Sequence, residues 1–392
     1  MIVPPDLLPA AALLSTRPAY GKGSLADLLP SVSAVLGVPG AEDVLGLGAQ
    51  LDGISRVAVL LVDGLGAYQL PAAAPHAPVL TDLAARSPAT LTAGFPSTTP
   101  VSLVTLGTGA LPGAHGVLGF TTRKPDGGIL NHIQWGDDPD PRRWQPVPTR
   151  LETAAAAGVA VTQVTRPEFK GTGLTVAANR GGAFRGAADP AALAEQMLAA
   201  LAAGSGPALV YGYHPDLDKR GHEDGVDSDS WRAAARDVDT LLDRLTDGLP
   251  AGCALLVTAD HGQLNVPVAE RIELADEPAL TAGLIAVAGA PRVRYLHVED
   301  GARDDVLAAW REVLGERAWV LTREEAIAGG WYGPVPAAHR GRLGDLVVIC
   351  LDRTAVLATG YDPPMVGRLV AYHGSVTAAE MTIPLLTFCR TP

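Results

Sequence analysis

The fold is most constrained by short apolar runs that end in polar residues and alternate with alanine-rich helical stretches. RVAVLLVDG (residues 56–64) is typical of a buried strand followed by a turn, and GPALVYGYHPDLD (206–218) and CALLVTADHGQ (253–263) have the same form. Helical patterns cover residues 190–204 and 230–250. Strands and helices in this order predict an α/β fold with a mostly parallel central sheet and helices on both faces.

One part of the chain departs from this alternation. Between about residues 266 and 343 the patterns favour a small inserted α+β lobe, which includes the strand-like run PRVRYLHVE (291–299). The core would then comprise residues 1–265 and 344–392, with a strand of the main sheet in GDLVVICLD (344–352). The sequence therefore predicts one catalytic core interrupted by one lobe.

Composition and charge exclude several classes of protein. Hydrophobic residues make up 47% of the 392 residues and charged residues 18%, which is typical of a folded chain. The formal net charge of -12 argues against a nucleic-acid polymer as partner, but it does not exclude a small phosphorylated substrate. The N-terminal stretch has no basic region before an apolar one, and no run is long enough to span a bilayer. We therefore expect a cytoplasmic protein with no membrane partner.

Acidic and imidazole side chains follow the apolar runs, where each predicted strand ends. Because the carboxyl ends of parallel strands share one edge of a sheet, we expect these side chains to converge. Alone, each has an ordinary explanation, such as an Asp-Gly turn, a surface ion pair or a loop histidine. Together they suit two divalent metal ions, which stabilise the attacking and leaving oxygens during in-line displacement at phosphorus. The residues are Asp63, Asp218, His222, Asp260, His261 and His373.

The stretch FPSTTPVSLVTLGTG (95–109) places three hydroxyls, Ser97, Thr98 and Thr99, before an apolar helical run. One hydroxyl is enough to cap a helix, and Pro100 suits its first turn. A simple N-cap is one interpretation. The other is that one hydroxyl, at a helix N-terminus that attracts anions, attacks phosphorus to give a covalent intermediate.

Five ordered motifs carry a resemblance to a known family. Between residues 56 and 386 the chain resembles the type I phosphodiesterase and nucleotide pyrophosphatase family of the alkaline phosphatase superfamily. The motifs are LLVDGLG, FPSTTPVSLVTLGTGALPGAHGVLGF, YHPDLDKRGHEDG, VTADHGQ and YHGSVTAAEMTIPLL. The resemblance implies a metal-dependent hydrolase of phosphoric diesters or pyrophosphates that works through a phospho-threonine intermediate.

The resemblance also implies the roles of individual residues. The family's nucleophile stands ten residues before the glycine of a Thr-Gly pair, which gives Thr99 when counted back from Gly109, with Thr98 as the alternative. It implies two bound divalent ions, zinc first, with manganese or iron as alternatives. One ion would take Asp63, Thr99, Asp260 and His261, and the other would take Asp218, His222 and His373.

The chain departs from the family's pattern in its substrate contacts. Animal members carry an asparagine three residues after the nucleophile, where this chain has Ser102. Ser102, Lys170 and Tyr213 are the candidate substrate-binding residues. A phosphomonoesterase or phosphonate hydrolase of the same superfamily is the alternative activity. A non-enzymatic, metal-stabilised binding protein would have lost the nucleophile or a ligand, whereas all seven positions are intact here.

Overall fold

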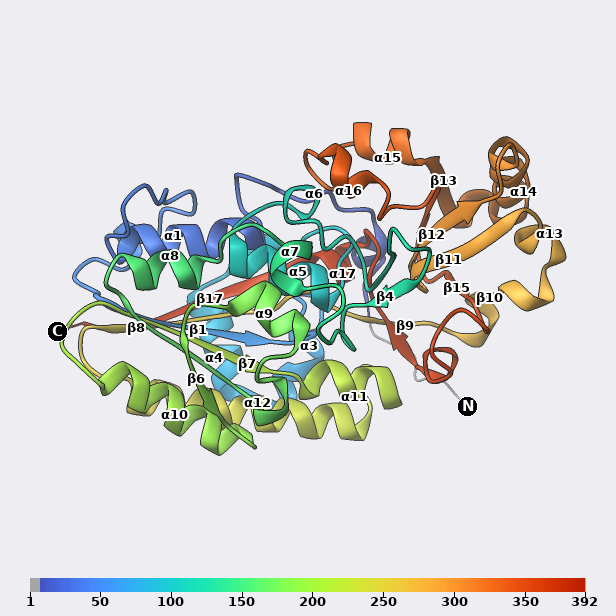
Figure 1. The fold of residues 1–392 in the computed structure, drawn as a ribbon. Coiled ribbons are helices and arrows are strands. Elements are labelled where there is room, and N and C mark those ends of the chain that lie inside the picture. The colour runs from blue at the N-terminus through green and yellow to red at the C-terminus, as the bar shows by residue number, and fades with distance from the viewer. Residues whose placement is uncertain (1–7, 392) are drawn as a thin grey trace.

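A seven-stranded sheet forms the centre of the computed structural model, which describes residues 8–391 (Figure 1). Its strand order is β2-β17-β8-β1-β7-β5-β6. The neighbours β8, β1, β7, β5 and β6 run parallel, and β17 pairs antiparallel with both β8 and β2. The predicted mostly parallel sheet is therefore confirmed. The strands are β1 (Arg56–Val62), β2 (Ala89–Thr92), β5 (Ala160–Thr165), β6 (Ala183–Gly186), β7 (Ala208–His214), β8 (Cys253–Thr258) and β17 (Thr382–Arg390).

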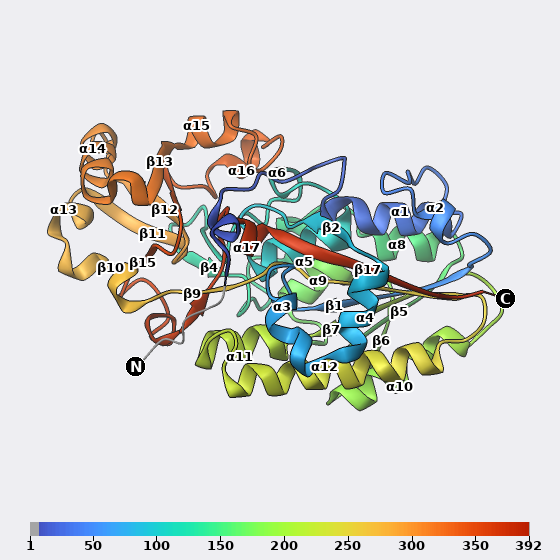
Figure 2. The same cartoon turned by 180° about the vertical axis from the view of Figure 1, so that it is seen from behind.

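Helices cover both faces of this sheet, as Figures 1 and 2 show from opposite sides. One face carries α1 (Leu28–Val35), α5 (Thr99–Thr108), α8 (Arg150–Ala156) and α9 (Gly173–Asn179). The other carries α4 (Pro78–Arg86), α10 (Pro190–Ala202), α11 (Asp216–Asp224) and α12 (Asp229–Gly248). Helix α12 shows why they pack there, because its buried residues, from Trp231 through Val238 to Leu245, recur at helical spacing along one face.

A second sheet has six strands in the order β13-β14-β12-β11-β3-β4, and every pairing in it is antiparallel. Trp310 of α14 is fully buried in the core beneath it. The elements are β3 (Thr121–Arg123), β4 (Ile129–Asn131), β11 (Leu284–Ala290), β12 (Val293–Val298), β13 (Ala318–Thr322), β14 (Leu346–Cys350), α14 (Arg303–Leu314) and α15 (Arg323–Ala328).

The strand expected to return to the main sheet does not do so. Strand β14 pairs with β12 and β13 in the six-stranded sheet, and β3 and β4, from the region assigned to the core, extend that same sheet. All five residues of β14 are buried, so its continuous apolar run resembles that of a central parallel strand. The domain boundaries 1–265, 266–343 and 344–392 stay a prediction.

Shorter elements complete the described chain. Strands β9 and β16 pair antiparallel, and β10 and β15 pair parallel, as two small sheets. None of the helices in residues 8–391 is long and apolar enough to cross a bilayer. The cytoplasmic location stays a prediction, and the first seven residues of the N-terminal stretch lie outside the described part. The elements are α2 (Leu47–Gln50), α3 (Leu70–Ala73), α6 (Pro112–His115), α7 (Pro141–Trp144), α13 (Pro278–Thr281), α16 (Ala337–Arg340), α17 (Ala378–Met381), β9 (Leu264–Asn265), β10 (Arg271–Glu273), β15 (Ala355–Leu357) and β16 (Ala371–Tyr372).

Candidate active site

Three adjacent strands of the main sheet, β8, β1 and β7, deliver acidic residues to its carboxyl edge. Asp63 directly follows β1, Asp260 follows β8, and Asp218 lies in α11, just after β7. The Asp218 N–H donates to the Asp63 carbonyl at 3.1 Å, which fixes the two turns together. Gly64 between them has φ +75°, and a Cβ there would lie 2.9 Å from the Asp218 Cα. The expected convergence at the strand ends is therefore present, and it requires glycine at position 64.

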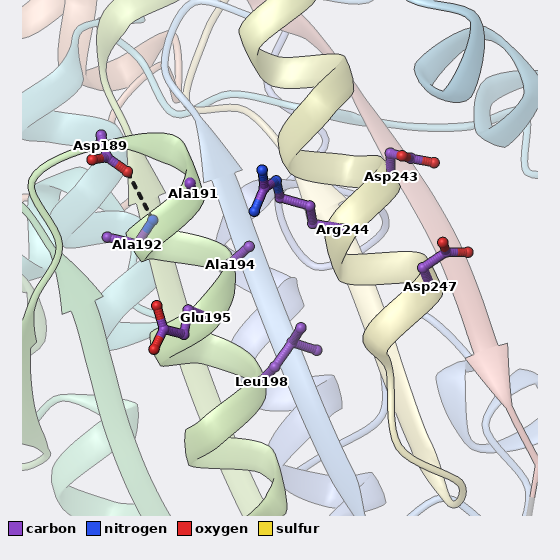
Figure 3. A pocket seen from close by; sticks show the side chains of 9 residues that line it. All are labelled: Asp189, Ala191, Ala192, Ala194, Glu195, Leu198, Asp243, Arg244 and Asp247. Atoms are coloured by element: carbon purple, nitrogen blue, oxygen red, sulfur yellow. Dashed lines mark hydrogen bonds between the residues drawn. The ribbon is translucent and has the colours of Figure 1, made fainter.

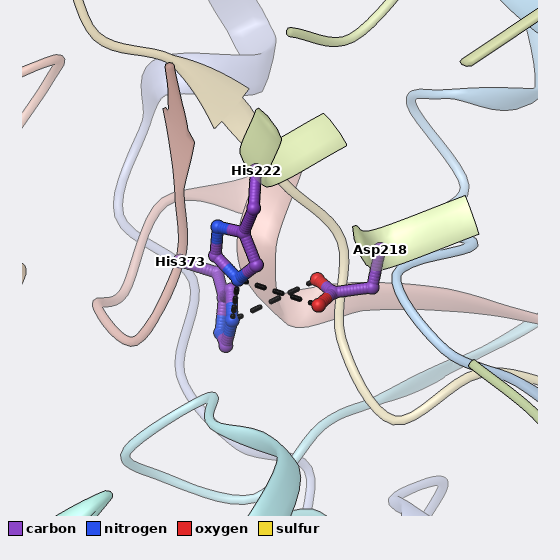
Figure 4. A group of neighbouring side chains, drawn as sticks. All are labelled: Asp218, His222 and His373. Atoms are coloured by element: carbon purple, nitrogen blue, oxygen red, sulfur yellow. Dashed lines mark hydrogen bonds and ion pairs between the residues drawn. The ribbon is translucent and has the colours of Figure 1, made fainter. Parts of the chain in front are cut away.

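Asp218, His222 and His373 form one compact group (Figure 4). Asp218 and His222 stand one turn apart on α11, with His222 Nε2 3.3 Å from Asp218 Oδ2. His373 follows β16, and its Nε2 lies 3.2 Å from His222 Nε2 and 3.8 Å from Asp218 Oδ1. These are the three residues that the family resemblance implied for one ion.

Asp63, Asp260, His261 and Thr99 form a second group beside the first. His261 Nε2 lies 3.2 Å from Asp260 Oδ2, 3.6 Å from Asp63 Oδ1 and 3.1 Å from Thr99 Oγ1. The rings of His261 and His373 stack with their centroids 3.5 Å apart, so the two groups are contiguous. Asp218 also lies close enough to Asp63 and His261 to share an ion with them. The sequence did not indicate that Asp218 stands between both groups.

The histidine tautomers favour metal binding. The Nδ1 atoms of His222 and His373 face the carbonyl oxygens of Ala371 and Ser97, each at 2.8 Å, and His261 Nδ1 faces the Gly262 carbonyl at 3.2 Å. Because a carbonyl only accepts, each Nδ1 carries the proton and each Nε2 presents a lone pair. With both rings neutral in this tautomer, the Nε2 atoms of His222 and His373 lie 3.2 Å apart with no proton between them, and a shared cation would satisfy both lone pairs.

The electrostatics of the site point the same way. Burial, together with the neighbouring Asp260 and Asp218, raises the pKa of Asp63 well above its usual range, and burial also raises the pKa of Asp260. Burial and the adjacent His261 and His222 lower the pKa of His373. Asp63 Oδ1 and Asp260 Oδ2 are buried and have no hydrogen-bond partner among the described residues. Divalent cations fit this donor set because they would supply both the missing charge and the missing partners.

The three hydroxyls before α5 have different surroundings. Ser97 Oγ donates to the Ser375 carbonyl at 2.7 Å, whereas Thr98 Oγ1 is buried without a hydrogen-bond partner in residues 8–391. Thr98 is the N-cap residue, but its side chain makes no capping bond. Thr99 is the first residue of the helix, and its hydroxyl faces His261. Of the three hydroxyls, that of Thr99 bonds directly to a side chain of the acidic and imidazole cluster.

The candidate substrate contacts lie in different places. Ser102 is buried one turn beyond Thr99, and its hydroxyl has no partner in the described chain. The Tyr213 hydroxyl donates to Asp63 Oδ2, so it holds a candidate metal ligand. Lys170 is exposed, with its ammonium 5.8 Å from the centroid of the Phe184 ring. Lys170 is therefore not among the side chains that the fold gathers at the strand ends.

Sequence reasoning missed Gln263. Its side-chain amide donates to the Asp218 carbonyl at 3.0 Å and also to the Asp218 carboxylate. A Cβ at Gly221 would lie 1.8 Å from Gln263 Oε1, so the glycine of the Asp-x-x-Gly-His motif makes room for this amide. The only available signal was the position of Gln263, two residues after His261.

A separate hollow lies between α10 and α12 (Figure 3). Acidic residues dominate its charged lining, which includes Asp189, Glu195 and Asp247 around Arg244. None of its lining residues belongs to either group at the strand ends, so the chemistry of the site does not extend into it.

Residues 57–375 match the family model described as type I phosphodiesterase / nucleotide pyrophosphatase, a range that contains both groups of candidate ligands. Among curated protein sequences, none matched the chain. Solved structures with a similar fold include an inactive variant of murine ectonucleotide pyrophosphatase / phosphodiesterase 5 in complex with AMP, with a TM-score of 0.68 and 19% identity over 86% of this chain and 88% of that one. Phosphonoacetate hydrolase from Sinorhizobium meliloti 1021, in complex with phosphonoacetate, has a TM-score of 0.63 and 21% identity over 85% and 89%. At these identities the likeness concerns the fold.

Proposed function

Since the chain belongs to the type I phosphodiesterase / nucleotide pyrophosphatase family and is a phosphoric ester hydrolase, we propose that it cleaves diesters or pyrophosphates through a covalent intermediate on Thr99. The observation that carries this proposal is the position of the Thr99 hydroxyl. It stands at the N-terminus of α5, 3.1 Å from His261 Nε2, beside buried carboxylate oxygens that have no hydrogen-bond partner in the described chain.

Two divalent metal ions complete the proposed site, with zinc first and manganese or iron as alternatives. Asp63, Thr99, Asp260 and His261 would hold one ion, and Asp218, His222 and His373 would hold the other. When bound, such ions neutralise charge on the transferring group and make a hydroxyl or water a better nucleophile. The lone pairs on the three Nε2 atoms and the unpaired carboxylate oxygens support this assignment.

Different residues of the chain would attack phosphorus, donate to phosphoryl oxygens and orient a metal ligand. The Thr99 hydroxyl gives up its proton as its oxygen attacks phosphorus, so a Thr99 O–P bond forms while the bond from phosphorus to the leaving-group oxygen breaks, and the leaving group takes up a proton from solvent. Water then cleaves the Thr99 O–P bond and restores the hydroxyl. We infer that the N-terminal end of α5 and the Ser102 hydroxyl, which is buried without a hydrogen-bond partner in the described chain, donate to phosphoryl oxygens. Tyr213 orients Asp63 through its hydrogen bond to that carboxylate.

We further propose a small phosphorylated substrate rather than a nucleic-acid polymer. The complexes of two proteins of similar fold with AMP and with phosphonoacetate support small ligands. The net charge of -12 also opposes the binding of a polyanionic backbone.

The test compares kcat/KM on bis-(p-nitrophenyl) phosphate and on p-nitrophenyl phosphate, for protein that has been stripped of metal and reloaded with Zn²⁺ or Mn²⁺. We expect a strong preference for the diester, and loss of both activities in the stripped protein. A preference for the monoester would contradict the substrate class and favour the phosphomonoesterase alternative. Full activity without metal would contradict the two-ion site.

A further inference from the structure

A buried ion pair joins the six-stranded sheet to the segment that carries His373. Arg292 lies between β11 and β12, and Glu380 lies in α17; both side chains are fully buried. Arg292 Nε donates to Glu380 Oε1 at 3.0 Å, and Nη2 donates to Oε2 at 2.8 Å, a bidentate pairing. A charged pair is costly to bury, and its geometry here is well satisfied, since the third arm of the guanidinium donates to the Thr354 carbonyl.

The Glu380 carboxylate also fixes the backbone just after His373. It accepts from the Ser375 N–H at 2.9 Å and from the Thr377 N–H and hydroxyl at 3.3 and 2.5 Å. The Glu380 carbonyl accepts from the Gly262 N–H at 2.9 Å, directly after His261. One residue therefore contacts both segments that carry the stacked histidines.

The segment that Glu380 holds is bonded in turn to the loop before Thr99. Ser97 Oγ donates to the Ser375 carbonyl at 2.7 Å, and the Ser97 N–H donates to the Gly374 carbonyl at 3.2 Å. The Ser97 carbonyl accepts from His373 Nδ1 at 2.8 Å and so sets the orientation of that imidazole. A path of buried hydrogen bonds therefore runs from Arg292 through Glu380, Ser375 and Ser97 to His373.

We propose that Arg292 and Glu380 are positioning residues, through which the six-stranded sheet sets the affinity for the ion held by Asp218, His222 and His373. This inference rests on the proposed two-ion function. A histidine ligand binds well only when its ring is held at the correct angle, and the groups that hold it contribute to metal affinity even though they do not touch the ion. Loss of the Glu380 carboxylate would remove the acceptor of Ser375 and Thr377, and loss of Arg292 would leave that carboxylate without its buried partner. Either change would loosen the segment that orients the His373 ring.

The same sheet offers a matched control pair. Arg294 stands two residues after Arg292, is equally buried, and donates to Asp362 Oδ1 at 2.7 Å and to the Val356 carbonyl at 2.9 Å. In the described chain, neither Arg294 nor the Asp362 carboxylate makes a hydrogen bond to Ser97, His373, Ser375 or Thr377. Variants of Arg294 and Asp362 should therefore reproduce the loss of a buried ion pair without disturbing the ligand.

The experiment titrates the metal-free full-length chain with Co²⁺ and follows the visible absorption, with Zn²⁺ competition against a chromophoric chelator. For Glu380→Gln and Arg292→Lys we expect one of the two ions to bind about tenfold more weakly, with an altered Co²⁺ spectrum for that ion. We expect Asp362→Asn and Arg294→Lys to bind both ions as tightly as the wild-type chain does, even where the variant's melting temperature falls. Arg292→Lys keeps a positive charge in the core, so it covers the case in which Glu380→Gln fails to fold.

Equal affinities in all variants would overturn the positioning role, and so would an equal loss in the test and control pairs. These outcomes are distinct from failure of the proposed function. If the wild-type chain binds no ion, the two-ion function itself fails. If the wild-type chain binds two ions and hydrolyses the diester, and Glu380→Gln binds both ions as tightly, then this inference alone fails.

Discussion

At the scale of single residues, the environment separates three hydroxyls that the sequence presents side by side. Ser97 Oγ donates to a carbonyl, Thr98 Oγ1 has no hydrogen-bond partner in residues 8–391, and Thr99 Oγ1 faces His261.

Thr99→Ala should lower kcat at least a thousandfold, which is about 4 kcal/mol in activation free energy, because no attacking oxygen remains. Steady-state kinetics on the diester check this, with metal content and melting temperature measured in parallel. Thr98→Ala, the matched control, should keep kcat within about tenfold; a reversed order of the two variants would assign the nucleophile to Thr98.

The carboxylates of the site should cost stability when no metal is bound. Burial and the nearby Asp260 and Asp218 raise the pKa of Asp63, so its charged form disfavours the folded state. This penalty is absent below the ordinary carboxyl pKa and grows as pH rises towards the raised one. Asp63→Asn should therefore raise the melting temperature of the metal-free chain, more at pH 8 than at pH 5, while it weakens metal binding. Scanning calorimetry at both pH values checks this, and a lower melting temperature at pH 8 would contradict it.

The sequence motifs identified the candidate metal ligands but not the residues that hydrogen-bond to the ligands or to the segments that carry them. Asp63, Asp260 and His261 could be predicted because they follow apolar strands, and strand ends meet at one edge. Gln263 and Glu380 could not, since an isolated polar residue gives no pattern until the fold places its partner beside it. Lys170 was named as a candidate substrate contact, but it lies exposed on the surface. A lysine beside a glycine turn is common on exposed surfaces, so its sequence context did not distinguish a site residue.

At the scale of elements, α5 is held against α9 by a contact that tolerates no side chain. A Cβ at Gly107 would lie 1.8 Å from the Ala178 carbonyl oxygen, a backbone atom. Gly107→Ala should therefore force the helices apart, cost about 1–3 kcal/mol of stability, and lower kcat by displacing Thr99 at the other end of α5. Denaturant unfolding and diester kinetics check both effects. Gly341→Ala is the control, because a Cβ there meets nothing within 4 Å; equal behaviour of the two variants would contradict the packing argument.

The junction between α5 and α6 should make stability depend on pH. His115 Nε2 lies 3.0 Å from Thr105 Oγ1, and burial, with the nearby His339, His132 and Arg342, lowers the pKa of His115 to about 3. The unfolded chain takes up a proton there below about pH 6.5. The folded chain does not, so the free energy of unfolding falls by about 1.4 kcal/mol per pH unit as the pH drops towards the folded pKa.

His115→Gln removes this titrating group and should flatten the pH dependence of stability by about that slope. Urea unfolding at pH 7, 6 and 5 measures it, and the wild-type chain supplies the reference slope. Parallel pH profiles for the variant and the wild-type chain would show that His115 is not held neutral in the fold.

The sequence predicted whether a segment is a helix or a strand where its apolar pattern was long. It did not predict which sheet a strand joins. The strands β1, β7 and β8 and the helices α10 and α12 follow from apolar periodicity. Strand β14 has the same buried apolar character as these strands, yet it joins the antiparallel sheet, because its partners are fixed by tertiary packing. Strands β3 and β4 have three residues each, too few to show a period.

At the scale of the whole molecule, the site draws on both sheets. The parallel sheet supplies Asp63, Asp218 and Asp260 from its carboxyl edge, while the six-stranded sheet reaches His373 through Arg292 and Glu380. The net charge of -12 is thus compatible with an anionic substrate, since the proposed ions would supply positive charge where the side chains do not. On the proposed role of Arg292 and Glu380, the six-stranded sheet contributes to the metal site by holding the segment that carries His373.

The central claim, a covalent intermediate on Thr99, is tested most directly by the stereochemistry at phosphorus. One isomer of a chiral phosphorothioate diester would be hydrolysed by the metal-loaded chain in ¹⁸O-labelled water, and the configuration of the product determined. Each in-line displacement inverts phosphorus, so attack by Thr99 followed by attack of water predicts overall retention. Overall inversion would mean that water attacks the substrate directly, and it would contradict the account.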